Sequence, residues 1–130
     1  MAQAPGAPAA SEVDPIALHR AERSVRCLPF RRAFYVHVAQ QPISSRELCQ
    51  RDDGRTLVFV GFGPERCDDH FRWLIRLGVL RREVDGQGLT ERVRLTPLGR
   101  RLLERLPGEI PRAGLRERFH EHLRRQRPRF

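Results

Sequence analysis

The segment from Trp73 to Arg100, WLIRLGVLRREVDGQGLTERVRLTPLGR, constrains the fold more than any other part of the chain. It begins with the end of an apolar helix that stops at Gly78, because glycine is favoured just after the last helical turn. The runs 79–84 and 89–95 flank the turn sequence DGQG, which predicts a β-hairpin. Thr96-Pro97 then begins another helix, since proline fits the first helical position. We therefore expect a helix, a β-ribbon and a helix in direct succession.

Apolar residues at helical spacing predict further helices before this segment. Asp14-Pro15 combines a good N-cap with proline at the first position, and Pro29 ends or kinks the helix that follows. Two apolar stripes lie on either side of Pro29, and a third belongs to a core helix expected from about Pro64 to Leu77. The stripes are Leu18, Ala21, Val25 and Leu28; Phe30, Phe34 and Val38; and Phe71 with Leu74.

The region between these helices carries two local signals. Ser44 and Glu47 have the spacing of a capping box and predict a short helix. Asp53-Gly54 is a turn signal, and the apolar run Thr56–Val60 predicts a buried strand. The glycines of GFGP, which close this stretch, lack the spacing and the lysine of a phosphate-binding loop.

Composition divides the chain into three parts. Residues 1–13 are rich in Ala, Pro and Gly and are expected to be a disordered tail. Residues 14–106 hold the predicted helices and ribbon as one domain. Residues 107–130 hold a basic C-terminal helix, expected from Pro111 to about Gln126.

The net charge of +9 is concentrated in the C-terminal part of the chain. Residues 97–130 hold ten arginines against four acids, whereas residues 1–63 hold eight against six and residues 64–96 hold seven against six. Such an end suits a polyanion, and it is also typical of a solvated terminus. All 25 basic residues are arginine, which indicates the codon bias of a GC-rich genome rather than selection for phosphate contacts.

The sequence favours a reduced, cytoplasmic protein. Its three cysteines are far apart and form no CxxC pair, which is typical of free thiols in a reducing compartment. The N-terminus has neither the basic start nor the apolar run of a secretory signal, and no segment is long and apolar enough to cross a membrane.

The end of the third helix and the exit from the ribbon resemble a winged helix-turn-helix domain. Phe71, Leu74, Gly78, Val79 and Leu80 match the end of its third helix, and Leu95, Thr96 and Gly99 match the LTxxGR that leaves the wing in many bacterial regulators. The resemblance implies a mainly α fold with a small β-ribbon, here with extra N- and C-terminal helices. Residues 52–63 depart from it, because winged helices usually join the second and third helices by a tight turn. GVLRREVDGQGLT and RLTPLGR also resemble a family of small uncharacterised cyanobacterial proteins, from which no activity can be carried over.

The winged-helix resemblance implies a protein that binds double-stranded DNA, and a transcription regulator is our first hypothesis. In this fold the third helix enters the major groove and the wing contacts the DNA backbone or the minor groove. The surface concerned also carries acids, three near the start of the helix and three in the ribbon, which oppose phosphate binding. The candidate DNA-binding residues are Arg66, Arg72, Arg76, Arg81, Arg82, Arg92 and Arg94.

The alternative is a non-catalytic protein-interaction adaptor that keeps the fold without binding nucleic acid. Trp73 and Ile75 occupy positions where the family usually has polar residues. Either the N-terminal helix or the inserted strand covers them, or they form a partner surface. The stripe of Leu115, Phe119 and Leu123 is expected to dock on the domain or on a second copy, and the resemblance implies a homodimer formed through terminal helices. RNA binding through the arginine-rich end is a third, weaker option, because no aromatic platform accompanies it.

Catalysis is not expected. Cys67 and His70 share a helix face, but no second ligand pair accompanies them, so a core cysteine beside a partly exposed histidine is favoured over a metal site. His120 and His122 point apart on a helix. No nucleophile motif or cofactor fingerprint occurs, and no small-molecule ligand is evident.

Overall fold

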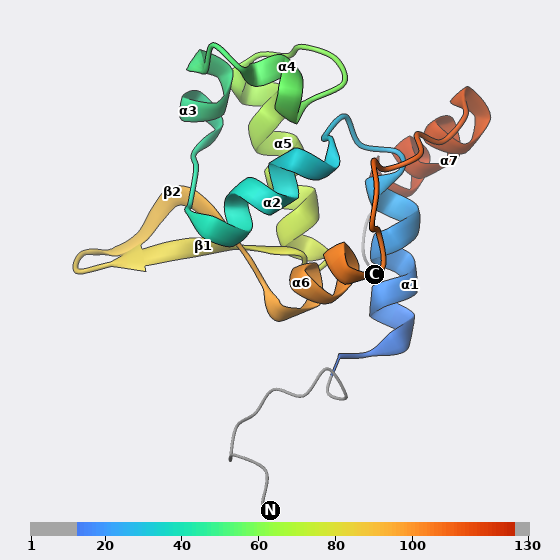
Figure 1. Cartoon of the computed structure of the whole chain (residues 1–130), viewed down its shortest axis with the longest axis horizontal. Helices are drawn as coiled ribbons and strands as arrows, with labels where there is room; N and C mark the ends of the chain where they lie inside the picture. Colours follow the sequence, from blue (N-terminus) through green and yellow to red (C-terminus); the bar gives the residue numbers. More distant parts are fainter. Residues whose placement is uncertain (1–12, 127–130) are drawn as a thin grey trace, which may run out of the picture.

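The computed structural model describes residues 13–126, and in this part the chain folds into seven helices and one two-stranded antiparallel sheet (Figure 1). The mainly helical expectation is thus confirmed. The elements are α1 (Pro15–Val25), α2 (Arg32–Gln40), α3 (Ser45–Gln50), α4 (Gly54–Leu57), α5 (Pro64–Arg76), β1 (Leu80–Asp85), β2 (Gly88–Leu95), α6 (Pro97–Glu104) and α7 (Leu115–Gln126).

The two ends of the chain bear on earlier expectations. The predicted disordered tail lies outside the described residues except for Val13, as do Arg127 and Arg129 of the basic C-terminus. The division at residue 106 stays a prediction. None of the helices within residues 13–126 combines the length and the apolar character that a membrane crossing requires.

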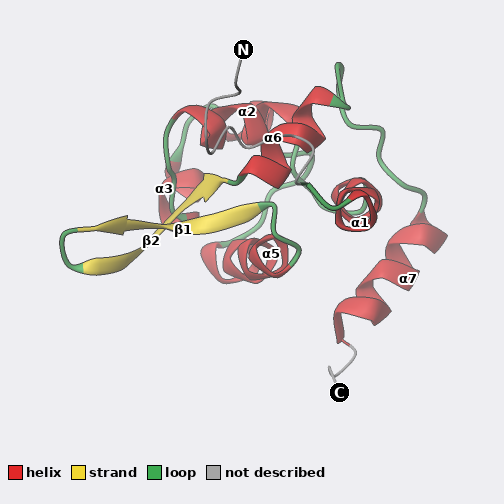
Figure 2. Cartoon of the chain, turned by 90° about the horizontal axis from the view of Figure 1, so that it is seen from below, coloured by secondary structure: helices red, strands yellow, loops and turns green. Residues whose placement is uncertain are grey.

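The first helix begins where the sequence predicts. The Asp14 carboxylate accepts a hydrogen bond from the Ile16 amide at 3.0 Å, and Pro15 takes the first helical position. Leu18, Ala21 and Val25 are buried, and α1 ends at Val25. In Figure 2, α1 is seen end-on between the central helices and α7.

An aromatic stack forms the centre of the core and joins the start of α2 to α5. Phe30 and Phe34 stack with their ring centroids 4.3 Å apart, and Phe71 stacks on them at 5.9 and 5.7 Å. Tyr35 meets Phe34 edge-on at 5.1 Å. All four rings are almost fully buried, so each pair adds about 0.5–1.5 kcal/mol to the free energy gained by burying apolar area.

The capping box of α3 is confirmed. The Glu47 amide donates to the Ser44 hydroxyl at 3.1 Å, while the Ser44 amide donates to the Glu47 carboxylate at 2.9 Å. Leu48 supplies the buried contact of this short helix.

The predicted strand Thr56–Val60 is wrong. The turn at Asp53-Gly54 continues into the helical turn α4, in which the Thr56 amide donates to the Asp53 carbonyl at 2.9 Å and the Val58 amide donates to the Gly54 carbonyl at 3.0 Å. Only Val58 makes a β-bridge, with Phe30. A short apolar run buries Leu57 equally well as a helical turn, and no neighbouring strand extends the pairing beyond this bridge.

The end of α5 leads directly into the ribbon. Gly78 has a φ of +87°, a conformation that glycine adopts without strain. The Val79 amide then donates to the Leu74 carbonyl at 2.9 Å, which closes the helix in a Schellman pattern. Leu80 pairs with Leu95, and a β-bulge lies between Arg82 and Val84.

One edge of the ribbon is extended by a residue far back in the sequence. Ile43, which lies between α2 and α3, exchanges two backbone hydrogen bonds with Val93, at 2.9 and 3.3 Å. Val93 and Leu95 are buried. Leu89 is 75% exposed, because it pairs with Val84 near the ribbon tip, beyond the helices.

Substitution of Gly99 by alanine is expected to destabilise the junction between the ribbon and α6. A Cβ atom there would lie 2.6 Å from the Val79 carbonyl oxygen and 2.5 Å from Leu95 Cδ1. We expect Gly99→Ala to lower the free energy of unfolding by about 1–3 kcal/mol, measured by urea denaturation. Gly86→Ala, where a Cβ atom would meet nothing within 4 Å, is the matched control. Equal stability of the two variants would contradict the close packing.

Candidate nucleic-acid interface

The outward face of α5 carries charge of both signs. Arg66, Arg72 and Arg76 are exposed there, together with Glu65 and Asp69. Arg72 forms an ion pair with Asp69, one helical turn earlier. Arg66 makes no ion pair or side-chain hydrogen bond within the described residues. The structure therefore brings the three predicted arginines to one face, with one of them neutralised.

The ribbon arginines differ in their partners. Arg92 donates from Nη2 and Nε to the two carboxylate oxygens of Glu47, at 2.8 and 3.1 Å. The Nη2 atom of Arg94 lies 2.7 Å from a carboxylate oxygen of Glu83. Arg82 donates to the Glu91 carbonyl at 2.9 Å. Arg81 is exposed and makes no side-chain contact of this kind within residues 13–126. The ribbon thus presents one free guanidinium and three engaged ones.

The pairing acids were not recognised from the sequence as partners of particular arginines. Glu47 lies on α3, 45 residues from Arg92, and only the bridge at Ile43 brings the two elements together. Hydrogen bonds from Arg92 and from Ser44 lower the pKa of Glu47, and burial opposes them. Arg94 lies opposite Arg81 in the ladder, and Glu83 sits at the bulge between Arg82 and Val84, so the Glu83–Arg94 pair depends on an irregularity that the alternation of residues does not predict.

Trp73 and Ile75 are both half-buried and pack against the core. The guanidinium carbons of Arg76 and Arg125 each lie 5.8 Å from the centre of the Trp73 ring. Arg125 belongs to α7, so part of the cover comes from the C-terminal helix, which the sequence did not suggest. The inserted strand that was expected to cover these residues does not form.

The C-terminal helix docks through its polar side, and the expectation that its apolar stripe packs on the domain is wrong. The buried Glu121 carboxylate accepts from the Ser24 hydroxyl of α1 and from Arg124, while Arg26 pairs with Glu117 at 3.3 Å. The stripe faces outward instead. The exposed fractions are 78% for Leu115, 60% for Phe119 and 48% for Leu123.

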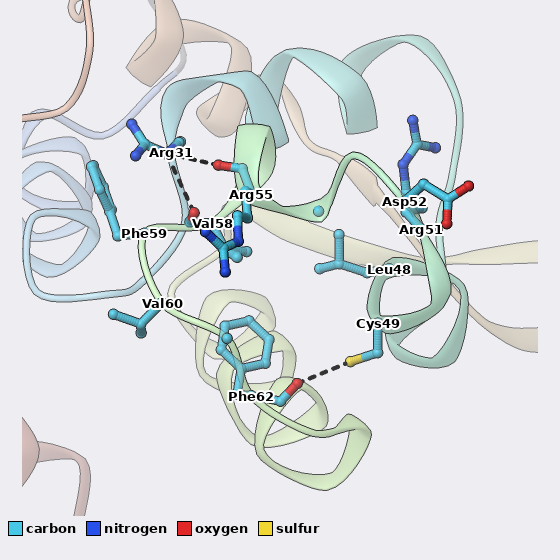
Figure 3. A pocket seen from close by; sticks show the side chains of 12 residues that line it. Arg31, Leu48, Cys49, Arg51, Asp52, Arg55, Val58, Phe59, Val60 and Phe62 are labelled. Carbon is cyan, nitrogen blue, oxygen red and sulfur yellow. Dashed lines mark hydrogen bonds between the residues drawn. The ribbon is translucent and has the colours of Figure 1, made fainter.

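A cavity of about 760 Å³ lies where α3, α4 and the loop of residues 58–62 meet (Figure 3). Arg31 fastens this region, because its Nε donates to the carbonyl oxygens of Arg55 and Val58 at 3.1 and 3.3 Å, and its guanidinium lies 4.5 Å from the Phe59 ring centre. The Cys49 thiol donates to the Phe62 carbonyl at 3.4 Å. These contacts account for how the 52–63 segment is held against the core.

Cys67 and His70 are both buried in the core, whereas the sequence predicted a partly exposed histidine. Burial, together with the charges of Arg125 and Arg66, lowers the pKa of His70 to about 4, against the opposing effect of Asp69. Burial also raises the pKa of the Cys67 thiol. Within residues 13–126, no three His, Cys, Asp or Glu side chains gather as a metal site would require.

The fold and this surface define a small, mainly helical domain with an arginine-bearing β-ribbon. Residues 11–125 match the family model described as Npun_F0494-like, so the chain belongs to that family. This match confirms the narrower of the two resemblances seen in the sequence. No curated protein and no solved structure matches the chain.

The buried imidazole is expected to make stability fall in mild acid. Because the folded protein holds the pKa of His70 at about 4, below its ordinary value of 6.5, only the unfolded chain gains a proton there between these pH values. Stability supplied by neutral His70 is therefore present above pH 6.5 and is lost as the pH falls toward 4. The expected loss between pH 7 and pH 5 is about 2 kcal/mol.

Urea denaturation of the parent chain and of His70→Gln at both pH values gives the free energy of unfolding of each. The contribution of His70 is the amount by which the parent chain loses more stability between pH 7 and pH 5 than the variant does. His122→Gln, which removes an exposed imidazole, is the matched control. The same pH dependence in His70→Gln as in the parent chain would rule out a role for His70.

Proposed function

We propose that this chain is a winged-helix protein that binds duplex DNA and acts as a transcription regulator. In this proposal α5 is the recognition helix and β1–β2 is the wing. The order of α3, α5 and the ribbon supports it, and so does the Ile43–Val93 bridge, which ties the segment before α3 to the base of the ribbon. Helix α4, which replaces the usual tight turn, packs against α2 and α3 and not over the outward face of α5, which α7 approaches through Arg125.

The observation that carries the proposal is a pair of unengaged arginines on adjacent elements. Arg66 on α5 and Arg81 on β1 are exposed, and neither has an ion-pair partner in the described part of the chain. The pairs Arg72–Asp69 and Arg92–Glu47 are about half-exposed, and such surface pairs are worth at most about 1 kcal/mol. Phosphate contacts can therefore replace them at little cost, and their arginines become available to the backbone of DNA.

The salt dependence of duplex binding tests the proposal. We expect the chain to bind a mixed-sequence duplex at low salt, with an affinity that falls linearly as the logarithm of the salt concentration rises. Removing one phosphate contact by Arg66→Gln or Arg81→Gln should weaken binding and reduce the slope by about 1. Fluorescence anisotropy at several salt concentrations measures both quantities.

The matched control is Arg20→Gln, which removes an exposed arginine of α1. Its affinity and slope should equal those of the parent chain, because α1 lies away from the ribbon (Figure 2). Failure to bind duplex DNA at low salt, or an equal effect of all three substitutions, would reject the assignment of α5 and the ribbon.

A second candidate function is a protein-interaction adaptor, favoured by the outward stripe on α7. Leu115, Phe119 and Leu123 present apolar side chains on one exposed helix face, and an apolar face of this kind is typical of an interaction surface. A second copy of the chain, docked stripe to stripe, would bury these residues. A homodimer through the terminal helix is compatible with either candidate function.

Polar substitution of the apolar stripe on α7 tests whether the chain forms a homodimer through it. The free energy of unfolding of the combined variant Leu115→Ser, Phe119→Ser and Leu123→Ser should lie within about 0.5 kcal/mol of that of the parent chain, because substitutions of exposed residues cost little stability. Self-association, measured by sedimentation velocity, should be lost in this variant. A parent chain that stays monomeric at high concentration would contradict the homodimer, and a large loss of stability would show that the stripe packs internally.

A further inference from the structure

A second cavity, of about 380 Å³, lies between α7 and the body of the domain, and its charge is unbalanced. It is bounded by residues 60–63, by the first half of α5 and by the inner side of α7. A single carboxylate, Glu121, faces four guanidinium groups around it, and the imidazole of His70 adds no charge near neutral pH. The guanidinium groups belong to Arg66, Arg112, Arg118 and Arg125.

The one carboxylate is already engaged. One Glu121 oxygen accepts from the Ser24 hydroxyl, and the other accepts from Arg124 at 2.9 and 3.2 Å. Since Ser24 belongs to α1 and Arg124 does not line the cavity, Glu121 serves the docking of α7. The positive charge of the cavity is therefore left without a carboxylate dedicated to it.

Three buried nitrogen atoms at this cavity lack a hydrogen-bond partner. They are Nε of Arg112, Nε of Arg118 and Nδ1 of His70, whose residue is only 8% exposed. A buried polar group without a partner costs about 1–3 kcal/mol, and more when it is charged. Burial and the neighbouring charge of Arg118 also lower the pKa of Arg112, so the two guanidinium groups are close enough to repel each other.

An anion in the cavity would balance the charge of the guanidinium groups that line it. Guanidinium groups bind phosphate oxygens through two parallel hydrogen bonds, and these are among the stronger ones in proteins. The same cavity has an apolar wall formed by Pro29, Val60 and Phe62, which suits the organic part of a ligand. Its volume lies within the range of small-molecule sites, about 300–1,000 Å³.

We propose that this cavity is a binding site for a small phosphate monoester, held by Arg112 and Arg118 beneath α7. Arg112 and Arg118 line the cavity, so a small anion that enters it meets their guanidinium groups, whereas a cavity of about 380 Å³ does not admit the backbone of a duplex. The site lies on the inner side of α7 and shares Arg66 with the DNA-binding surface proposed above, but its two main ligands, Arg112 and Arg118, belong to no part of that surface.

Isothermal titration calorimetry tests the site on the full chain without DNA. The probes are inorganic phosphate, glucose 6-phosphate and AMP, with glucose and adenosine as uncharged counterparts. The phosphate esters should bind, inorganic phosphate should bind more weakly because it lacks the organic part, and the uncharged molecules should give no heat. Arg112→Gln and Arg118→Gln should each weaken ester binding by about tenfold or more.

Arg116→Gln is the matched control, because Arg116 is exposed on α7 and does not line the cavity. Urea denaturation without ligand should show Arg112→Gln and Arg118→Gln to be at least as stable as the parent chain, since each removes an unpaired charge.

Three outcomes would overturn the site: no binding of either ester; unchanged ester affinity in both variants; and equal binding of glucose and glucose 6-phosphate.

Discussion

The stack of Phe30, Phe34 and Phe71 is the contact on which the rest of the structure depends. It fixes the start of α2 against the middle of α5, and the direction of α5 in turn fixes where the ribbon leaves the body. His70 meets Phe30 edge-on at 5.8 Å at the border of this stack, next to the cavity beneath α7. A change in the aromatic packing would therefore alter the outward face of α5 and the basic cavity together.

Arginine serves different purposes in different parts of this molecule. Arg31 and Arg32 hold backbone carbonyl groups and bind Glu109, so they act as internal ties. Arg92 and Arg94 bind carboxylates at the surface, where the pairs contribute little to stability. Arg112 and Arg118 stand apart from both groups, because their buried Nε atoms have no partner. The total of 25 arginines says little by itself, and the partner of each guanidinium indicates its role.

Features set by neighbouring residues could be predicted from the sequence, whereas contacts between distant segments could not. The Ser44–Glu47 capping box, the stop at Gly78 and the hairpin between residues 79 and 95 depend on neighbouring residues, and all three were anticipated. The run Thr56–Val60 was misassigned because its first part, with Leu57, fits a helical turn as well as a strand, and only Val58 of the rest makes a β-bridge. The orientation of α7 could not be foreseen, since it depends on Ser24 binding a carboxylate 97 residues away. The basic cavity was missed for the same reason: its arginines come from three separate segments.

Thr96 joins three elements at one point. Its hydroxyl donates toward the carbonyl oxygens of Gly78 and Val79 and accepts from the Gly99 amide, so the end of α5, the base of the ribbon and the start of α6 meet there. Beyond the bridge of Ile43 to Val93, the paired side chains Val84 and Leu89 near the ribbon tip are exposed to solvent. The base of the ribbon is thus held by the helical body, whereas its tip has no such support. Bending of its outer half displaces no core side chain, so the tip can adjust to a curved surface while the helical body keeps its shape.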